Sequence, residues 1–223
     1  MAEASAGRPY RALLVDYGGV LTTSVTTSFA AFCVANGVSP ERMKALMGAA
    51  YGSDPASAGP DAELIPSMET GTLPADEFDR RLAVILSEGL AEPLDPTDLT
   101  ARMLAQITPD ERTIEAVRIA RGHGVKTALV SNTWSLEASP SASLDIFDVR
   151  VLSGQEGVRK PQPEIYLRAA ARLGVEPNGC VFVDDLPSNV EGARAAGMTG
   201  VLHRDAAITI PRLEELFGLS LSG

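Results

Sequence analysis

An alternation of short apolar segments with helix-like segments is the feature that most constrains the fold of this chain. Each apolar segment has the length of one buried strand, and each intervening segment is long enough for a helical crossover between parallel strands. Strands that are apolar on both faces are typical of a sheet covered by helices on both sides. The pattern predicts an α/β fold with a parallel, doubly wound sheet. Strands are expected at residues 12–15, 126–130, 149–152, 180–183 and 199–202, and helices at 108–121, 163–173, 188–196 and 211–217.

The first apolar segment ends on a single carboxylate, Asp16, and Gly18 and Gly19 follow almost at once. A carboxylate at the C-terminal end of a parallel strand lies where open α/β sheets bind their ligands. Glycine lets backbone amides and carbonyls come close to a bound ion or substrate, so Gly18 is a candidate contact for either. The plain alternative is a strand followed by a glycine turn, with Asp16 as a helix cap.

Residues 22–107 differ from the rest of the chain because they show helical periodicity and contain no convincing strand. The pattern predicts helices near 25–36, 40–50, 74–90 and 98–106, with a loop rich in Gly, Pro, Ser and Ala at 51–67. This block is expected to be a helical lobe inserted after the first strand.

Polar groups end three of the predicted strands at one edge of the sheet, and the loop after another strand carries a lysine. Adjacent carboxylates repel one another and require a nearby cation. Their hard oxygen atoms suit Mg²⁺, which also favours a substrate phosphate. A lysine neutralises a carboxylate or a phosphoryl group, and hydroxyl and amide groups donate to phosphoryl oxygens. The residues concerned are Asp16, Ser131, Asn132, Lys160, Asp184 and Asp185.

This set of side chains predicts phosphoryl transfer. Asp16 is the candidate nucleophile, because a carboxylate beside a metal and a lysine can attack phosphorus and form an aspartyl-phosphate. The cations would then stabilise the charge on the equatorial phosphoryl oxygens.

Composition narrows the expected partners and location. A net charge of −10 argues against nucleic-acid binding, because phosphate backbones are held by Lys and Arg. No apolar run is long enough to suggest a membrane span. Cys33 and Cys180 lie in apolar segments and are expected to be free thiols, which favours a cytoplasmic location. The phosphoryl-binding side chains predict a small phosphorylated molecule as the partner.

Four segments resemble, in order and spacing, the motifs of the haloacid dehalogenase-like (HAD) hydrolase superfamily. They are Asp16-x-Gly-Gly-Val, Ser131-Asn132-Thr133, Lys160-Pro161, and Val183-Asp184-Asp185 with Asn189. Two sequence segments also resemble the phosphatase-like domain at the N-terminus of soluble epoxide hydrolases. They are Ser-Asn-Thr-Trp and Glu-Thr-Gly-Thr-Leu-Pro-Ala-Asp-Glu-Phe. The resemblance implies a HAD-like core with a Rossmann-like parallel sheet at 10–21 and 108–223 and a helical cap at 22–107. Residues 1–9 are expected to be a flexible tail, because the first residues are mostly small.

The same resemblance implies roles for individual residues. Asp16 would be the nucleophile, and Asp16, the carbonyl of Gly18 and Asp185 would hold Mg²⁺, with Asp184 close by. Ser131 and Lys160 would bind the phosphoryl group. Two supporting residues are Asn189 and Trp134. Asn189 is expected to hydrogen-bond Lys160 or a metal-bound water, with simple helix packing as the alternative. Trp134 would line the pocket or meet the cap, with packing in the core or at the domain interface as the more usual role of a lone tryptophan. Apart from the resemblance, Arg159 should point away from its neighbour Lys160 and is therefore expected at the surface.

Gly18 is where the chain departs from the superfamily pattern. Phosphatases of the superfamily usually carry a second aspartate here, an acid–base group of a kind that contributes about 10²–10⁴-fold to the rate. Alkyl phosphates should therefore react more slowly than acyl phosphates or activated esters. We expect a Mg²⁺-dependent phosphatase of a small phosphorylated metabolite. The alternatives are a haloacid dehalogenase-type hydrolase, which needs no metal and so does not account for Asp184 and Asp185, or a low-turnover regulatory protein that binds a phosphorylated ligand.

Overall fold

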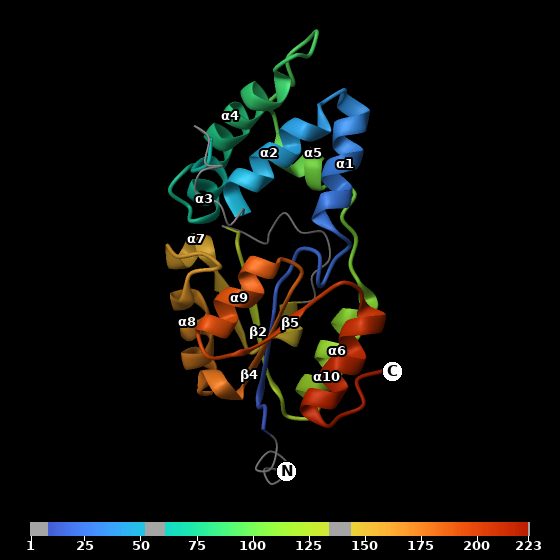
Figure 1. The fold of residues 1–223 in the computed structure, drawn as a ribbon, viewed down its shortest axis with the longest axis vertical. Coiled ribbons are helices and arrows are strands. Elements are labelled where there is room, and N and C mark those ends of the chain that lie inside the picture. The colour runs from blue at the N-terminus through green and yellow to red at the C-terminus, as the bar shows by residue number, and fades with distance from the viewer. Residues whose placement is uncertain (1–8, 52–60, 134–143, 223) are drawn as a thin grey trace.

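A computed structural model of the protein describes residues 9–51, 61–133 and 144–222. It shows a helical lobe next to a sheet that is flanked by helices (Figure 1). Trp134 and all but the last residue of the expected tail at 1–9 lie outside the described residues.

The sheet has five strands in the order β3-β2-β1-β4-β5, and every neighbouring pair is parallel. The chain runs outward from β1 through β2 to β3 and then returns to β4 on the other side of β1. The strand order therefore reverses beside β1, and such a switch point is where open sheets bind ligands. The predicted α/β fold is confirmed. The strands are β1 (Ala12–Val15), β2 (Lys126–Ser131), β3 (Val149–Leu152), β4 (Cys180–Asp184) and β5 (Thr199–Leu202).

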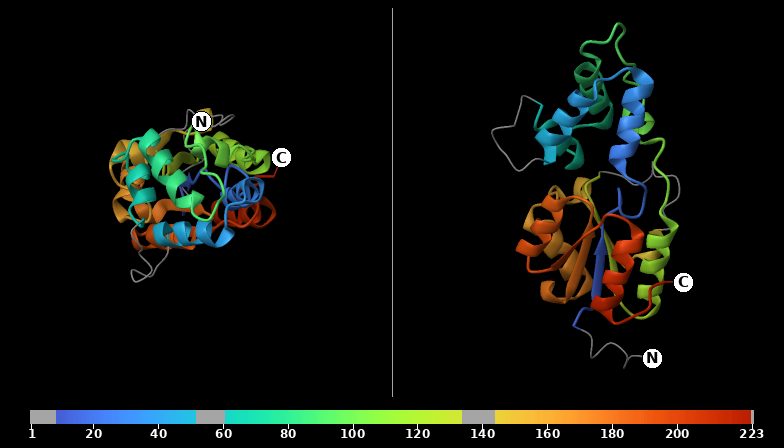
Figure 2. Two further views of the ribbon diagram at one scale, coloured as in Figure 1. Left: turned by 90° about the horizontal axis from the view of Figure 1, so that it is seen from above. Right: turned by 45° about the vertical axis from the view of Figure 1, so that its right-hand side comes forward.

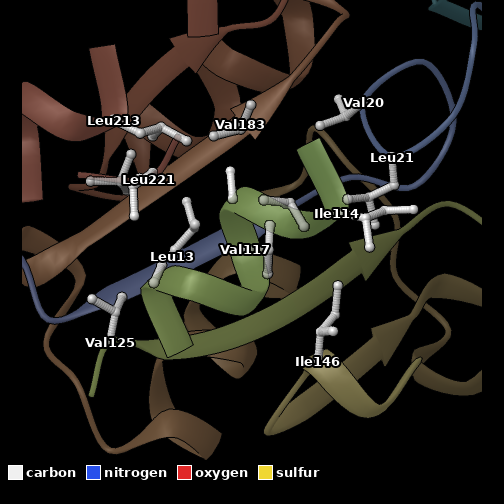
Figure 3. Packing of buried hydrophobic residues seen from close by; sticks show 14 of the residues in the cluster. Leu13, Val20, Leu21, Ile114, Val117, Val125, Ile146, Val183, Leu213 and Leu221 are labelled. Atoms are coloured by element: carbon white, nitrogen blue, oxygen red, sulfur yellow. The ribbon is translucent and has the colours of Figure 1, made fainter. Parts of the chain in front are cut away.

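Helices cover both faces of the sheet (Figure 2). Side chains of β1 alternate between the faces, as they must in a strand. Leu13 and Val15 pack with α6 (Glu111–Gly122) and α10 (Ala206–Phe217), as Figure 3 shows in part. Ala12 and Leu14 pack in the opposite layer, which contains α8 (Pro163–Leu173) and α9 (Pro187–Ala195). Shorter elements are α7 (Ser153–Glu156) and the 3₁₀ helices η2 (Leu144–Ile146) and η3 (Pro177–Gly179).

The helical lobe has a hydrophobic cluster of its own, which includes Phe32, Met43 and Leu82. It joins the core where Thr22 bridges Pro109 and the amide of Thr23 donates to the carbonyl of Thr108 at 2.8 Å. Within the described ranges, no helix has both the length and the apolar character needed to cross a bilayer. The lobe helices are α1 (Val25–Asn36), α2 (Pro40–Tyr51), α3 (Leu64–Glu69), α4 (Ala75–Ser87) and α5 (Leu99–Leu104).

Two sequence expectations were wrong in position. The last helix was expected to start at Pro211, but it begins at Ala206, because the Asp205 carboxylate accepts the amide of Ile208 at 3.0 Å and caps it. Residues 52–60 of the loop expected at 51–67 lie outside the described residues. The end of that loop belongs to α3, since Leu64 and Ile65 bury their side chains in the lobe cluster.

Candidate active site

Parallel pairing places Asp16 beside the end of β4. Val15 is in register with Val183, and the amide of Asp16 donates to the carbonyl of Val183 at 3.0 Å. Asp184 is the last residue of β4, and Ser131 is the last residue of β2 on the other side of β1. The three residues therefore meet at the carboxyl edge of the sheet, beside the switch point.

Lys160 reaches this edge from the loop between α7 and α8. Its Nζ lies 2.6 Å from Asp16 Oδ1 and 2.7 Å from Asp184 Oδ2. The side chain is only 1% exposed and its ammonium lies 5.5 Å from the centre of the Phe182 ring. Lys160 is thus a buried cation shared by two carboxylates.

Asp185 adds a third carboxylate to the site. One oxygen from each of Asp16, Asp184 and Asp185 lies within 4.8 Å of the others. Burial, assisted by repulsion from the neighbouring carboxylates, raises the pKa of Asp16 to about 7 although Lys160 acts to lower it. Burial and Asp184 likewise raise the pKa of Asp185 to about 6. Burial alone would lower the pKa of Lys160, but Asp16 and Asp184 raise it, so Lys160 stays an ammonium.

The residues present fit a divalent cation. Three ionised carboxylates and one ammonium leave a charge of −2, which a single Mg²⁺ would balance, and carboxylate oxygens are its preferred ligands. The backbone at Gly19 also lets the Asp185 carboxylate come close to the loop that follows Asp16. Gly19 has φ of +74°, and a Cβ at this residue would lie 2.4 Å from Asp185 Oδ2. Only glycine leaves the Asp185 carboxylate in this place.

Asp184 is held by more than Lys160. The Asn189 side-chain amide lies 3.1 Å from each carboxylate oxygen of Asp184, and the amide of Leu186 donates to Oδ1 at 2.9 Å. Asn189 was expected to contact Lys160 or a metal-bound water. Its Nδ2 donates to Asp184 and thereby orients the carboxylate with which Lys160 pairs, while the contact with a metal-bound water stays a prediction.

Asn132 holds the backbone of Lys160. Its Oδ1 accepts the Lys160 amide at 2.8 Å, and its Nδ2 donates to the Lys160 carbonyl at 3.1 Å. Nδ2 also lies 3.3 Å from Glu69 Oε2. Both side-chain donors are thus used within the protein, which differs from the expected donation to phosphoryl oxygens. Ser131 is 6% exposed, and its hydroxyl has no hydrogen bond within the described ranges, so that donor remains available.

Gly18 lies under the start of the helical lobe. A Cβ at this position would lie 2.9 Å from Cγ2 of Val25, in the first turn of α1. Helix α1 therefore restricts the space that the side chain of an acid–base aspartate at position 18 would occupy.

Sequence reasoning missed a second charged cluster next to the site and placed Arg159 wrongly at the surface. The Arg159 side chain is 13% exposed, and its Nε lies 2.6 Å from Glu69 Oε2. The expectation was wrong because it considered only the direction of Arg159 relative to Lys160 and not the lobe that covers it. The available signal was Glu69 itself, which opens the Glu-Thr-Gly segment already noted for its resemblance.

A profile of haloacid dehalogenase-like hydrolases matches residues 10–197 of this chain. The chain belongs to the haloacid dehalogenase-like hydrolase family. Several named proteins have sequences similar to that of this HAD-like hydrolase. It is 31% identical over 221 residues to acyl-CoA dehydrogenase family member 10 of Mus musculus, a match covering 97% of this chain and 20% of the relative. It is 28% identical over 151 residues to bifunctional epoxide hydrolase 2 of Rattus norvegicus (64% and 27% covered).

A phosphatase of Mycobacterium tuberculosis is 36% identical over 136 residues, covering 59% of this chain and 62% of the phosphatase. The HAD-like hydrolase thus spans less than two thirds of the length of each of these relatives. The resemblance to the HAD superfamily and to epoxide hydrolases is confirmed.

Solved structures share the fold of this HAD-like hydrolase. A HAD-like family hydrolase of Porphyromonas gingivalis has a TM-score of 0.61 at 22% identity, covering 93% of this chain and 98% of its own. A HAD family enzyme of Bacteroides thetaiotaomicron, solved in complex with magnesium and inorganic phosphate, has a TM-score of 0.58 at 20% identity (87% and 94% covered).

Proposed function

We propose that this HAD-like hydrolase is a Mg²⁺-dependent phosphatase of a small phosphorylated metabolite. The observation that carries the proposal is the buried Lys160 ammonium, 2.6 Å from Asp16 Oδ1 and 2.7 Å from Asp184 Oδ2, with Asp185 beside them. This arrangement has a net charge of −2 with its three carboxylates ionised, and one divalent cation makes it neutral. The similarity to a mycobacterial phosphatase and the magnesium–phosphate complex of a protein with the same fold support this proposal.

Asp16 would act as the nucleophile. Its carboxylate oxygen attacks phosphorus, the bond from phosphorus to the leaving oxygen breaks, and an aspartyl-phosphate forms. Water then attacks this phosphorus, which releases inorganic phosphate and restores the Asp16 carboxylate. Lys160 and the hydroxyl of Ser131 would bind phosphoryl oxygens, while the side chain of Asn132 holds Lys160 in place.

Asp16, the Gly18 carbonyl and Asp185 would hold Mg²⁺, with Asp184 close by. The proposal is supported by the three carboxylates, which each place one oxygen within 4.8 Å of the others. When bound, the ion would supply positive charge that favours the phosphoryl group and its transition state.

Gly18 sets the preferred leaving group in this proposal. With no carboxylic acid at this position, the leaving oxygen departs without a proton from residue 18. Acyl phosphates and aryl esters, whose leaving groups are weak bases, should therefore react faster than alkyl phosphates.

Residues 22–107 would form the cap over a core made of 10–21 and 108–223. A Cβ at Gly18 would lie 2.9 Å from Cγ2 of Val25. This distance supports the assignment, because it puts α1, the first helix of the lobe, against the loop that follows Asp16.

The test is phosphate release from acetyl phosphate, p-nitrophenyl phosphate and an alkyl phosphate, with and without Mg²⁺. We expect Mg²⁺-dependent release that falls in that order and disappears in Asp16→Asn. Asp76→Asn makes the same chemical change on the exposed side of α4 and should leave the rate unchanged. Halide release from a 2-haloacid without metal would favour a dehalogenase instead. No turnover by a protein that still binds Mg²⁺ would favour a ligand-binding protein.

A further inference from the structure

Glu69 brings a buried carboxylate from the helical lobe to the core. It is the last residue of α3 and is 3% exposed. Its Oε2 accepts Arg159 Nε from the core loop at 2.6 Å, and its Oε1 accepts the hydroxyl of Tyr51 at the end of α2. The guanidinium of Arg159 also lies 5.2 Å from the centre of the Tyr51 ring. Lobe and core thus share one buried charge cluster.

The same carboxylate oxygen reaches the residue that holds Lys160. Asn132 Nδ2 lies 3.3 Å from Glu69 Oε2, and the same amide bonds both the N–H and the C=O of Lys160. A continuous path of hydrogen bonds therefore runs from α3 through Asn132 to the backbone of Lys160. Its ammonium lies at the other end, between Asp16 and Asp184.

This path exists only while the lobe is docked. The Ser153 hydroxyl donates to the Glu69 carbonyl at 2.5 Å, and a Cβ at Gly71 would lie 3.0 Å from the carbonyl oxygen of Gly154. The turn after α3 therefore packs directly on the start of α7. If the lobe moved away, Arg159 would lose its counter-charge and Asn132 would lose one of its three hydrogen-bond contacts.

We propose that Glu69 is a positioning residue that makes the placement of Lys160 depend on docking of the helical lobe. The proposal rests on the proposed function for its effect on catalysis, since Lys160 is there a phosphoryl binder. It gives the lobe a role beyond covering the substrate, because docking of the lobe adds the contact from Glu69 that orients the Asn132 amide against the Lys160 backbone.

The test compares Glu69→Ala with Tyr51→Phe by two readouts. The first is hydrogen exchange of the Lys160 amide, which donates to Asn132 and needs no substrate. The second is the separation of kcat from KM on the best phosphate of the panel. Glu69→Ala should speed this exchange and lower kcat, each by about 10- to 100-fold, with KM changed less than about threefold. Tyr51→Phe removes only the bond to Oε1 and should change both readouts less than about threefold.

Two further variants guard against a simple loss of stability. Glu69→Leu with Arg159→Met removes both charges and keeps an apolar contact, so it should fold even where Glu69→Ala does not. It should still speed exchange at Lys160, because Asn132 has lost its acceptor. Ser28→Ala removes a buried bond inside the lobe, from the Ser28 hydroxyl to the Met103 carbonyl, and should leave kcat unchanged.

The proposal is overturned if exchange at Lys160 stays within twofold of wild type in both the single and the double variant. It is also overturned if Ser28→Ala, at an equal loss of melting temperature, gives the same effects. Failure of the proposed function has another signature: wild-type protein would release no phosphate, while exchange at Lys160 would still respond to Glu69.

Discussion

Replacing Lys160 by methionine tests the electrostatic balance of the site without any substrate. Methionine keeps most of the length of the lysine side chain but removes the ammonium that lies 2.6 Å from Asp16 and 2.7 Å from Asp184. The position is 1% exposed, so water cannot readily replace the lost charge. Three carboxylates would then share a space of 4.8 Å with no cation.

The expected loss of stability is large and depends on pH. Removing one partner of a buried ion pair costs about 3–5 kcal/mol in the free energy of unfolding. The pKa values of Asp16 and Asp185, about 7 and about 6, lie above the usual value because of burial, and Lys160 lowers both. Its removal therefore raises them further. The folded variant then binds more protons than the unfolded chain from about pH 4 up to these raised pKa values, so its unfolding free energy rises as the pH falls through that range.

Urea unfolding in metal-free buffer at pH 8 and pH 5 measures this effect. We expect Lys160→Met to lose about 3–5 kcal/mol relative to wild type at pH 8 and roughly half of that or less at pH 5. Lys126→Met is the matched control, since Lys126 is exposed on β2 and has no ion pair within the described ranges. It should change stability by about 0.5 kcal/mol or less at either pH.

The reasoning is refuted if Lys160→Met unfolds at the wild-type urea concentration at pH 8. An equal loss at both pH values would also refute it, because the cost would then come from packing and not from unbalanced carboxylates. Added Mg²⁺ should restore part of the stability at pH 8, in proportion to RT ln(1 + [Mg²⁺]/Kd).

Three further predictions concern the metal and the nucleophile loop. Mg²⁺ affinity measured by calorimetry should fall about tenfold or more between pH 8 and pH 5.5, because Asp16 and Asp185, with pKa values of about 7 and about 6, must lose protons to bind metal; a pH-independent Kd would contradict this. Gly19→Ala should weaken Mg²⁺ binding at least about tenfold, since φ of +74° disfavours alanine and its Cβ would displace the Asp185 carboxylate; wild-type affinity in the same titration would rule this out. Gly18→Asp alone should raise alkyl phosphate turnover little because Cγ2 of Val25 lies 2.9 Å from its Cβ, whereas combination with Val25→Ala should raise it by up to about 10²-fold; equal rates for the two variants would exclude this steric limit.

The sequence was sufficient to predict the parallel sheet and the meeting of three strand ends. Asp16, Ser131 and Asp184 each follow an apolar run, and parallel strands joined by right-handed crossovers end at one edge. Lys160 belonged to the same prediction because its loop follows β3. These are local patterns combined with one topological rule, and such patterns are visible along the chain.

Helix limits were less well predicted where two local signals compete. Pro211 suggested a helix start, but the Asp205 side chain caps the helix already at Ala206. In the block rich in Gly, Pro, Ser and Ala, the burial of Leu64 and Ile65 outweighed composition and produced α3. Both outcomes follow from interactions whose relative strengths cannot be read from residue preferences alone.

Only the tertiary structure decided which polar groups meet across the lobe and the core. Glu69 and Arg159 are 90 positions apart, and neither strand alternation nor helical periodicity says that they pair. The type of Asn132 side chain was known from the sequence, but its direction depends on the Lys160 backbone and on Glu69. Sequence patterns determine which face of each element is buried, whereas the docking of one buried face on another determines the partner of each charge.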